Sequence, residues 1–241
     1  PTRSALMTGR CPVRFGVMYE VIKSFSNYGV PAEEHFLPET FRTAGYQTAM
    51  AGKWHLGHAR VQYLPNSRGF EHSYGHLNGA LDYFKHVADG SPDWHRNGKS
   101  LREEGYSTDL IADEAVRLIQ GRDRGRPMFL YLPFNAPHGP LQAPERLLRK
   151  YATLPGPRRT YAAMVDAMDA AVGRVMAALD EEGLRENTLV LFLSDNGGHL
   201  PAGSSNGSLR GAKATAFEGG IRVPALMRWP GLLGENVLAR Q

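Results

Sequence analysis

Residues 161–196, YAAMVDAMDAAVGRVMAALDEEGLRENTLVLFLSDN, decide the fold class of this chain. The first part of this stretch repeats apolar residues at helical spacing: Met164, Met168, Ala171, Val175 and Leu179. The pattern predicts a long amphipathic helix from Tyr161 to Leu179, and Gly183 is a residue type that commonly ends helices. The apolar run Thr188 to Ser194 predicts a strand directly after this helix.

The same alternation of helix and strand continues outward along the chain. Two further helices, the second capped by Asp109, are predicted at residues 38–44 and 109–120. Three further strands are predicted at residues 47–51, 128–134 and 223–227. Two segments are expected to be loop-rich: residues 63–107 and 197–212. The alternation indicates an α/β fold with a mostly parallel sheet sandwiched by helices, and no second compact domain is expected.

The composition is that of an ordinary globular chain. Of the 241 residues, 42% are hydrophobic, which is enough for one substantial core and excludes a disordered chain. The longest apolar run, Thr188 to Leu193, is too short to span a membrane. The basic residues that give the net charge of +4 are dispersed, so no nucleic-acid surface is indicated. The single cysteine, Cys11, excludes an internal disulfide and is expected to pack in the fold.

A carboxylate and an amide, Asp195 and Asn196, directly follow the predicted strand at residues 188–194. Both offer hard oxygen ligands that suit Ca²⁺ or Mg²⁺. The glycines at positions 197 and 198 allow a tight turn beside them. On the residues alone, a strand-ending turn without a metal is the alternative interpretation. A second acidic pair, Asp166 and Asp169, is better explained as part of a solvated helix face.

Two more segments with reactive side chains follow predicted strands. Lys53 and His55 lie in GKWHLG, residues 52–57, where an extended backbone would place both on one face to hold an oxyanion and move a proton. His138 lies in the proline-bracketed loop NAPHGP, residues 135–140, which is a rigid mount for an acid or an anion donor. Each side chain taken singly could also be structural. Ligands gather at the carboxyl ends of parallel strands, so we expect these segments to converge.

Residues 1–10, PTRSALMTGR, resemble the downstream part of the type I sulfatase signature, Cys/Ser-x-Pro-x-Arg-x-x-x-x-Thr-Gly-Arg. The other segments occur in the order of that family: GKWHLG, NAPHGP, DNGG and LRGAKATAFEGGIRVP, residues 209–224. The resemblance covers almost the whole chain and implies an alkaline-phosphatase-like α/β fold. The stretch GHLNGALDYF, residues 75–84, is also similar to arylsulfatase B-type relatives, which act on sulfated sugars.

The resemblance implies a role for seven residues of this chain. Arg3 would steady the formylglycine, Lys53 and His55 would contact the formylglycine and the sulfate, and His138 and Lys213 would bind the sulfate. Asp195 and Asn196 would be metal ligands, with Ca²⁺ expected and Mg²⁺ as the alternative. Glu218 and Arg222 are expected to support their loop as an ion pair.

The resemblance also implies parts that lie outside this sequence. In type I sulfatases a Cys or Ser is oxidised to formylglycine by a formylglycine-generating enzyme, and that residue would lie two positions before Pro1. We therefore expect residues 1–241 to be a fragment of a sulfatase catalytic domain, without the first strand, the early acidic metal ligands and the C-terminal subdomain. An exported protein is expected by the same resemblance.

The implied activity is hydrolysis of the sulfate ester of a small molecule or a carbohydrate to an alcohol and inorganic sulfate. The parent would be active and this fragment alone inactive. Two alternatives remain open at this stage. One is a phosphonate or phosphate monoester hydrolase of the same superfamily, and the other is a non-catalytic fragment that retains the anion pocket.

Overall fold

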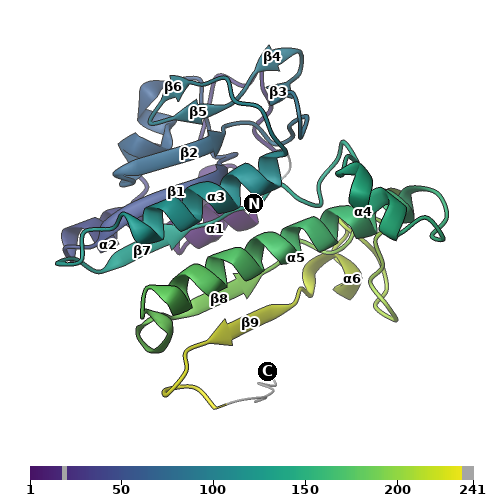
Figure 1. The fold of residues 1–241 in the computed structure, drawn as a ribbon. Coiled ribbons are helices and arrows are strands. Elements are labelled where there is room, and N and C mark those ends of the chain that lie inside the picture. The colour runs from purple at the N-terminus through teal and green to yellow at the C-terminus, as the bar shows by residue number, and fades with distance from the viewer. Residues whose placement is uncertain (18–20, 235–241) are drawn as a thin grey trace.

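The computed structural model describes residues 1–17 and 21–234, arranged around a five-stranded sheet in the order β6-β5-β2-β1-β7 (Figure 1). The central strand β1 (Gln47–Lys53) pairs in parallel with β2 (His72–His76) and with β7 (Met128–Tyr131). The short strands β5 (His95–Arg96) and β6 (Lys99–Ser100) add an antiparallel edge beyond β2. The sheet therefore has the expected parallel centre with an antiparallel edge.

Helices cover both faces of this sheet (Figure 1). The α-helices of the described residues are α1 (Thr2–Thr8), α2 (Leu37–Thr43), α3 (Ser107–Gln120), α4 (Glu145–Lys150), α5 (Pro157–Glu181) and α6 (Glu218–Ile221). Met7 of α1 packs with Met50 and Trp54 on one face. Ile111 of α3 packs with Ala51 on the other face, and α3 in turn packs along α5. Short 3-10 turns lie at Pro12–Phe15, Val61–Tyr63, Pro65–Arg68, Arg185–Asn187 and Leu200–Ala202.

Two glycines allow the parallel strands to close up at their carboxyl ends. Gly52 and Gly75 have φ values of 133° and 121°, which residues with a side chain rarely adopt. A Cβ on Gly52 would lie 2.3 Å from the carbonyl oxygen of Pro133, and one on Gly75 would lie 2.2 Å from the carbonyl oxygen of Gly52. This approach brings the end of β1 and the segment after β7 together, and Lys53 N donates to Pro133 O at 2.7 Å.

The last two strands form a ribbon of their own. β8 (Val190–Leu193) pairs antiparallel with β9 (Ala225–Arg228), and neither pairs with the five-stranded sheet in the part of the chain that is described. Val190 packs into the cluster formed by α3 and α5, so the ribbon lies against α5 (Figure 1). A two-residue hairpin, β3 (Val87–Ala88) with β4 (Ser91–Pro92), completes the strands. The strand predictions are confirmed here, but these two strands pair antiparallel.

Strand β2 lies inside a segment that the sequence predicted to be irregular. Its residues, HSYGH, contain no apolar run and no clean alternation, which is why the local pattern does not indicate a strand. Four of its five residues are buried because β2 lies between β1 and β5 and under α3. Its strand conformation therefore depends on neighbours that are distant in sequence.

The prediction that Asp109 caps its helix is wrong. Helix α3 begins at Ser107 after an extended Tyr106, and no side chain makes a cap bond. Asp109 lies in the first turn, where its Oδ1 lies 3.1 Å from Arg174 Nη2 of α5. The side chain therefore links two helices, and its negative charge near the start of α3 is still favourable.

Other boundaries shift by a few residues for local reasons. Helix α5 is longer than predicted, from Pro157 to Glu181, and Pro157 is favoured at a first helical position. Strand β7 ends at Tyr131 because Pro133 has no backbone N–H for a sheet ladder. In the described residues, no helix has both the length and the apolar character that crossing a membrane requires.

Candidate active site

The guanidinium of Arg3 connects the ends of several segments. Arg3 Nη1 donates to the carbonyl oxygen of Lys53 at 3.1 Å and to Tyr131 Oη at 3.3 Å. Arg3 Nη2 lies 3.5 Å from Asp195 Oδ2, and the Arg3 side chain is only 14% exposed. The Arg3 guanidinium therefore lies where helix α1, strands β1 and β7, and the loop after β8 meet.

Lys53 ends β1 and is only 5% exposed. Burial lowers the pKa of this lysine from its usual value to about 7, and the positive charges of Arg3 and Lys213 act in the same direction. The carboxylate of Asp195 opposes them. Three cations thus share the site with one described carboxylate, and such an excess of buried positive charge is relieved when an anion binds.

The prediction of an extended backbone at His55 is wrong. This residue follows the end of β1 with φ of 60°, and its Nε2–H donates to the carbonyl oxygen of Ile22 at 2.9 Å. Burial, reinforced by Lys53 and Arg3, lowers the pKa of His55 to about 3. The neutral ring therefore carries its proton on Nε2, and Nδ1 is left as a proton acceptor.

His138 lies in the loop after β7 and is neutral for similar reasons. Its Nδ1–H donates to the carbonyl oxygen of Gly139 at 2.7 Å, which leaves Nε2 without a proton. Burial lowers its pKa to about 4, and the charges of Lys53 and Lys213 contribute. Tyr83 Oη fixes the loop by donating to the carbonyl oxygen of His138 at 2.8 Å.

Asp195 and Asn196 turn the chain at the end of β8. The Asp195 side chain is 42% exposed, and Thr2 Oγ1 donates to its backbone carbonyl. Asn196 Nδ2 donates to Gly197 O at 2.9 Å, and Asn196 Oδ1 accepts no hydrogen bond from a described residue. Two adjacent oxygen donors fit a hard cation such as Ca²⁺. Among residues 1–17 and 21–234, no group of three or more His, Cys, Asp or Glu side chains could hold a metal, so these two would be part of a larger ligand set.

The loop that carries Lys213 is held by its own backbone and by Asn206. Lys213 N donates to Gly198 O at 3.0 Å. Asn206 Oδ1 accepts from Gly198 N at 2.8 Å, while Asn206 Nδ2 donates to Gly211 O at 2.9 Å. The role of Asn206 cannot be predicted from the sequence, because it depends on the closed loop, in which this amide bonds to both Gly198 and Gly211. The predicted Glu218–Arg222 ion pair is present at 3.5 Å.

Two further buried polar residues near the site were missed. His76 is the register partner of Lys53 on the neighbouring strand, and neither of its ring nitrogens has a hydrogen-bond partner among the described residues. Asn135, which opens the His138 loop, is 4% exposed, and within residues 1–17 and 21–234 both polar atoms of its side chain lack a hydrogen-bond partner. Nothing in the local sequence indicates these unpaired states, because they depend on the packing of β1, β2 and β7.

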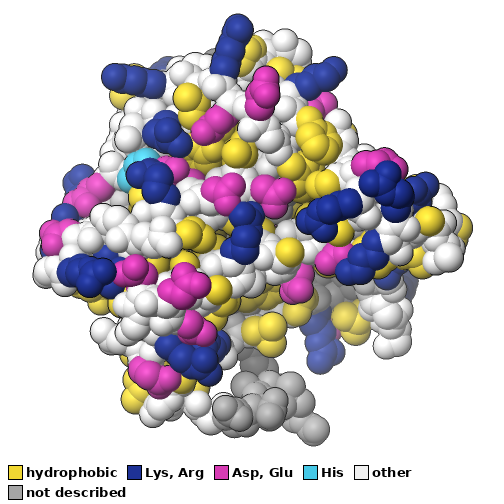
Figure 2. All heavy atoms as spheres, in the orientation of Figure 1, with side chains coloured by type: hydrophobic (Ala, Val, Ile, Leu, Met, Phe, Trp, Pro, Cys, Tyr) yellow, Lys and Arg dark blue, Asp and Glu magenta, His cyan; other side chains and the backbone are white. Residues whose placement is uncertain are grey.

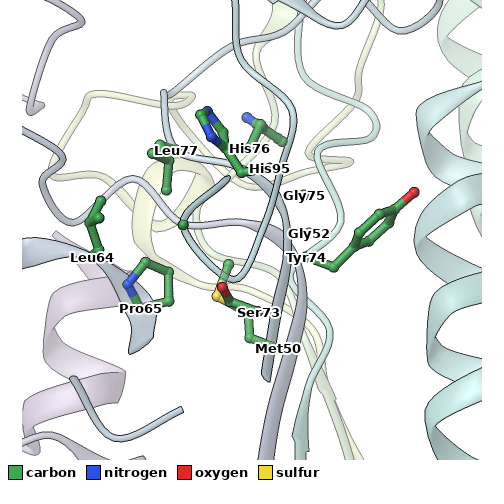
Figure 3. A pocket seen from close by; sticks show the side chains of 11 residues that line it. Met50, Gly52, Leu64, Pro65, Ser73, Tyr74, Gly75, His76, Leu77 and His95 are labelled. Carbon is green, nitrogen blue, oxygen red and sulfur yellow. The ribbon is translucent and has the colours of Figure 1, made fainter. Parts of the chain in front are cut away.

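A small cavity of about 10 Å³ lies beside these strands, lined by Met50, Gly52, Ser73 and Gly75 among others. Figure 3 shows Met50 and Ser73 at one end of it and the rings of His76 and His95 at the other. A space of this size holds at most one water molecule, so it is not a substrate pocket.

Two further sequence predictions, for Cys11 and for Asp166, have different outcomes. Cys11 is exposed and free, so the prediction that it packs in the fold is wrong: it lies at the turn between α1 and the next 3-10 helix. Asp166 pairs with Lys150, whose Nζ lies 2.7 Å from its Oδ2, as suits a charged helix face. Figure 2 shows acidic and basic side chains interspersed over the face formed by α3 and α5, so no single-sign patch gathers there.

Comparison with known protein families shows to which family this chain belongs. The family model for sulfatases matches residues 1–240. This chain belongs to the sulfatase family.

Sulfatases with known sequences match the chain over its whole length. It is 34% identical to arylsulfatase J of Mus musculus over 250 residues, which cover 100% of this chain and 42% of the relative. It is also 34% identical to N-acetylgalactosamine-6-sulfatase of Homo sapiens over 264 residues, which cover 100% of this chain and 49% of the relative. The chain thus spans about half the length of these sulfatases.

Solved sulfatase structures have the same fold. A crystal structure of Ps i-CgsB in complex with k-i-k-neocarrahexaose superposes with a TM-score of 0.89 at 38% identity, over 96% of this chain and 55% of that one. PsFucS1 sulfatase from Pseudoalteromonas sp. superposes with a TM-score of 0.76 at 27% identity, over 96% of this chain and 52% of that one. The sulfatase, alkaline-phosphatase-like fold expected from the sequence is confirmed.

Proposed function

We propose that this chain is part of a sulfatase that hydrolyses sulfate esters to an alcohol and inorganic sulfate. The observation that carries the proposal is the concentration of positive charge around Lys53, where Arg3 and Lys213 both lower its pKa and Asp195 opposes them. A site of this kind favours a compact anion. Membership of the sulfatase family supports a sulfate ester as that anion.

The family's formylglycine would supply the hydroxyl that attacks sulfur, and Ca²⁺ would balance the charge of the sulfate. Asp195 and Asn196 would help to hold the ion, and Arg3 would lie beside the formylglycine. Negative charge grows on the sulfuryl oxygens during the reaction, so Lys53 and Lys213 stabilise it by lying against those oxygens.

The two histidines have complementary roles in this proposal. His138 Nε2 carries no proton in the free site, but a bound sulfate favours the protonated ring, which then gives that proton to the leaving oxygen. His55 Nδ1 is an acceptor whose ring is held by Ile22 O, so it can take a proton from the attacking side. One histidine thus serves as the acid and the other as the base.

The substrate class in this proposal is a sulfated carbohydrate of the galactose series. Support comes from relatives: one is named for N-acetylgalactosamine-6-sulfate, and Ps i-CgsB was solved with a neocarrahexaose. The motif register of residues 1–10 places the formylglycine precursor two positions before Pro1, so the parent would be matured by a formylglycine-generating enzyme. Export of the parent is part of the same proposal.

The test is turnover of 4-nitrophenyl sulfate by the matured parent, beside 4-nitrophenyl phosphate and a phenylphosphonate monoester. We expect the sulfate ester to be preferred, and Lys53→Ala to lower kcat/KM by about a hundredfold or more. Lys99→Ala, an exposed lysine on β6, is the matched control and should leave the rate unchanged. Preferred turnover of the phosphonate would support the phosphonate hydrolase instead. Sulfate binding without any turnover would support a non-catalytic anion-binding protein.

A further inference from the structure

The ring of His55 lies against the segment that follows β2. We call residues 77–79, Leu-Asn-Gly, the post-β2 segment. His55 N donates to Leu77 O at 3.0 Å. A Cβ on Gly79 would lie 2.5 Å from both Cε1 and Nε2 of His55 and 3.1 Å from its Nδ1. Gly79 is not in the left-handed backbone region, so this position requires a glycine for space and not for backbone conformation.

A buried carboxylate, Asp93, fixes the post-β2 segment. Asp93 is 3% exposed. Its Oδ1 accepts from Leu77 N at 3.0 Å, and its Oδ2 accepts from Asn78 N at 2.9 Å and from Asn78 Nδ2 at 3.0 Å. Burial alone would raise the pKa of Asp93, but hydrogen bonds from His95 and from the two backbone N–H groups lower it below its usual value. The carboxylate is therefore ionised, and hydrogen bonds to an ionised acceptor are stronger than those between neutral groups.

The opposite side of the ring is held by Ile22. His55 Nε2–H donates to Ile22 O at 2.9 Å, and Ile22 is 2% exposed. The backbone of His55 has φ of 60°, which residues with a side chain seldom adopt, and the bond from His55 N to Leu77 O stabilises it there. A ring that turned away from this orientation would lose the bond to Ile22 or collide with Gly79.

We propose that Gly79 and Asp93 are positioning residues for His55: Asp93 fixes the post-β2 segment, and Gly79 leaves the space in which the imidazole keeps its Nε2–H on Ile22 O. This orientation makes Nδ1 the proton acceptor. The use of that acceptor as a base in sulfate ester hydrolysis rests on the proposed function, whereas the orientation of the ring rests on its contacts alone. Both residues act through His55 and not on the substrate.

The first measurement is ¹⁵N NMR of residues 1–241 labelled on histidine at pH 7, with His55→Gln to assign the signal. We expect wild-type His55 to be neutral with its proton on Nε2. Gly79→Ala should displace the ring and give averaged shifts for the two nitrogens. Asp93→Asn should have a smaller effect of the same kind, because the amide keeps one acceptor oxygen. Gly173→Ala on α5, where a Cβ meets no atom within 4 Å, is the matched control and should keep the wild-type signal.

The second measurement is turnover of 4-nitrophenyl sulfate by the matured parent, together with inhibition by inorganic sulfate. Gly79→Ala should lower kcat by about tenfold to a hundredfold, because a displaced base loses much of its contribution. The inhibition constant of sulfate should stay within about threefold of wild type, because the proposed sulfate ligands Lys53, His138 and Lys213 are unchanged. A purely structural role of Gly79 would lower kcat and sulfate affinity together.

The outcomes separate this inference from the proposed function. A wild-type His55 that carries its proton on Nδ1, or that is charged at pH 7, overturns the inference without any variant. An unchanged His55 signal in folded Gly79→Ala also overturns it, and so does an equal loss of kcat and sulfate affinity. The same signal in Asp93→Asn decides if Gly79→Ala does not fold. A displaced ring with unchanged kcat supports the positioning and contradicts the base assigned to His55 in the proposed function.

Discussion

At the scale of single residues, Lys53 shows how the site is prepared for an anion. Its ammonium is buried beside the cations Arg3 and Lys213, and its pKa is lowered to about 7. In the unfolded chain this lysine would be fully protonated at pH 7. Its burial in the folded chain disfavours the protonated form and therefore lowers the stability of the fold at this pH. This is a common trade of stability for binding in functional sites.

We predict that Lys53→Met stabilises the chain at pH 7 while it abolishes sulfate binding. Between pH 7 and the usual lysine pKa the unfolded state binds more protons than the folded state, so wild-type stability rises with pH in this window. The gain from Lys53→Met should be about 1 to 4 kcal/mol at pH 7 and should shrink toward pH 10. Urea unfolding at both pH values measures it, with Lys99→Met as the control. A variant less stable than wild type at pH 7 would contradict the prediction.

The same lysine predicts how sulfate binding depends on pH. Deprotonation of Lys53 removes a cation from the site, so sulfate affinity of the wild type should fall as the pH rises from 6 through about 7 to 8. Calorimetric titration with sulfate at constant ionic strength tests this. Affinity that stays constant over this range would show that Lys53 is not required as a cation.

Cys11 is a second residue whose environment makes a clear prediction. Its thiol is exposed and free, so Cys11→Ser should change the free energy of unfolding by less than about 0.5 kcal/mol. Sulfate binding should also be unchanged. A thiol reagent should label the native wild type at the rate of a small-molecule thiol, and slow labelling that accelerates in urea would contradict the exposure of Cys11.

At the scale of elements, Glu114 of α3 joins the helix to the sheet. This residue is 4% exposed, and its carboxylate accepts from His72 on β2, from Arg96 on β5 and from Arg117. Burial alone would raise the pKa of Glu114, but the hydrogen bonds from His72 and Arg117 lower it to about 2. Strand β2, which has little apolar sequence of its own, is therefore held by a buried ionic contact as well as by its backbone.

We predict that Glu114→Ala destabilises the chain by about 2 to 3 kcal/mol at pH 7, because His72, Arg96 and Arg117 lose a buried carboxylate partner. Since the folded pKa is lowered, this contribution is fully present above the usual glutamate pKa and is lost as the pH falls toward about 2. The difference between variant and wild type should therefore shrink in acid. Thermal unfolding at pH 7 and pH 3 measures it, with exposed Glu104→Ala as the control. A difference that is the same at both pH values would show that packing, and not charge, explains the loss.

At the scale of the whole molecule, the site is built from parts that are far apart in sequence. Arg3 joins Asp195 across almost the whole chain, and both act on the charge of Lys53. Asp195 and Asn196 are adjacent, but the described residues contain no group of three or more His, Cys, Asp or Glu side chains that could hold a metal ion. The isolated chain should therefore bind sulfate but bind a metal ion only weakly.

We predict that the isolated chain binds sulfate but does not hydrolyse aryl sulfates. The sulfatase signature implies a nucleophile two residues before Pro1, whereas the cations that would bind sulfate, Arg3, Lys53 and Lys213, belong to residues 1–241. Ca²⁺ should bind only weakly, with Kd of about 0.1 mM or higher, because affinity depends on the number and charge of the ligands. A 4-nitrophenyl sulfate assay and calcium titration test both statements. Metal-dependent turnover by residues 1–241 alone would refute the formylglycine assignment.

The sequence by itself determined the features that depend on local pattern and residue chemistry. Helical spacing predicted α5, an apolar run predicted β8, and the residues of the GKWHLG, NAPHGP and DNGG segments indicated the family. These features are readable because hydrophobic periodicity and short motifs involve residues that are close along the chain.

Only the tertiary structure decided which of these parts meet and what state they adopt. The strand conformation of β2, the hydrogen bonds of Arg3, the lowered pKa of Lys53 and the proton positions on His55 and His138 all depend on distant partners. Burial and register are properties of the packed molecule, and a side chain acquires its charge state from the neighbours that the fold brings to it.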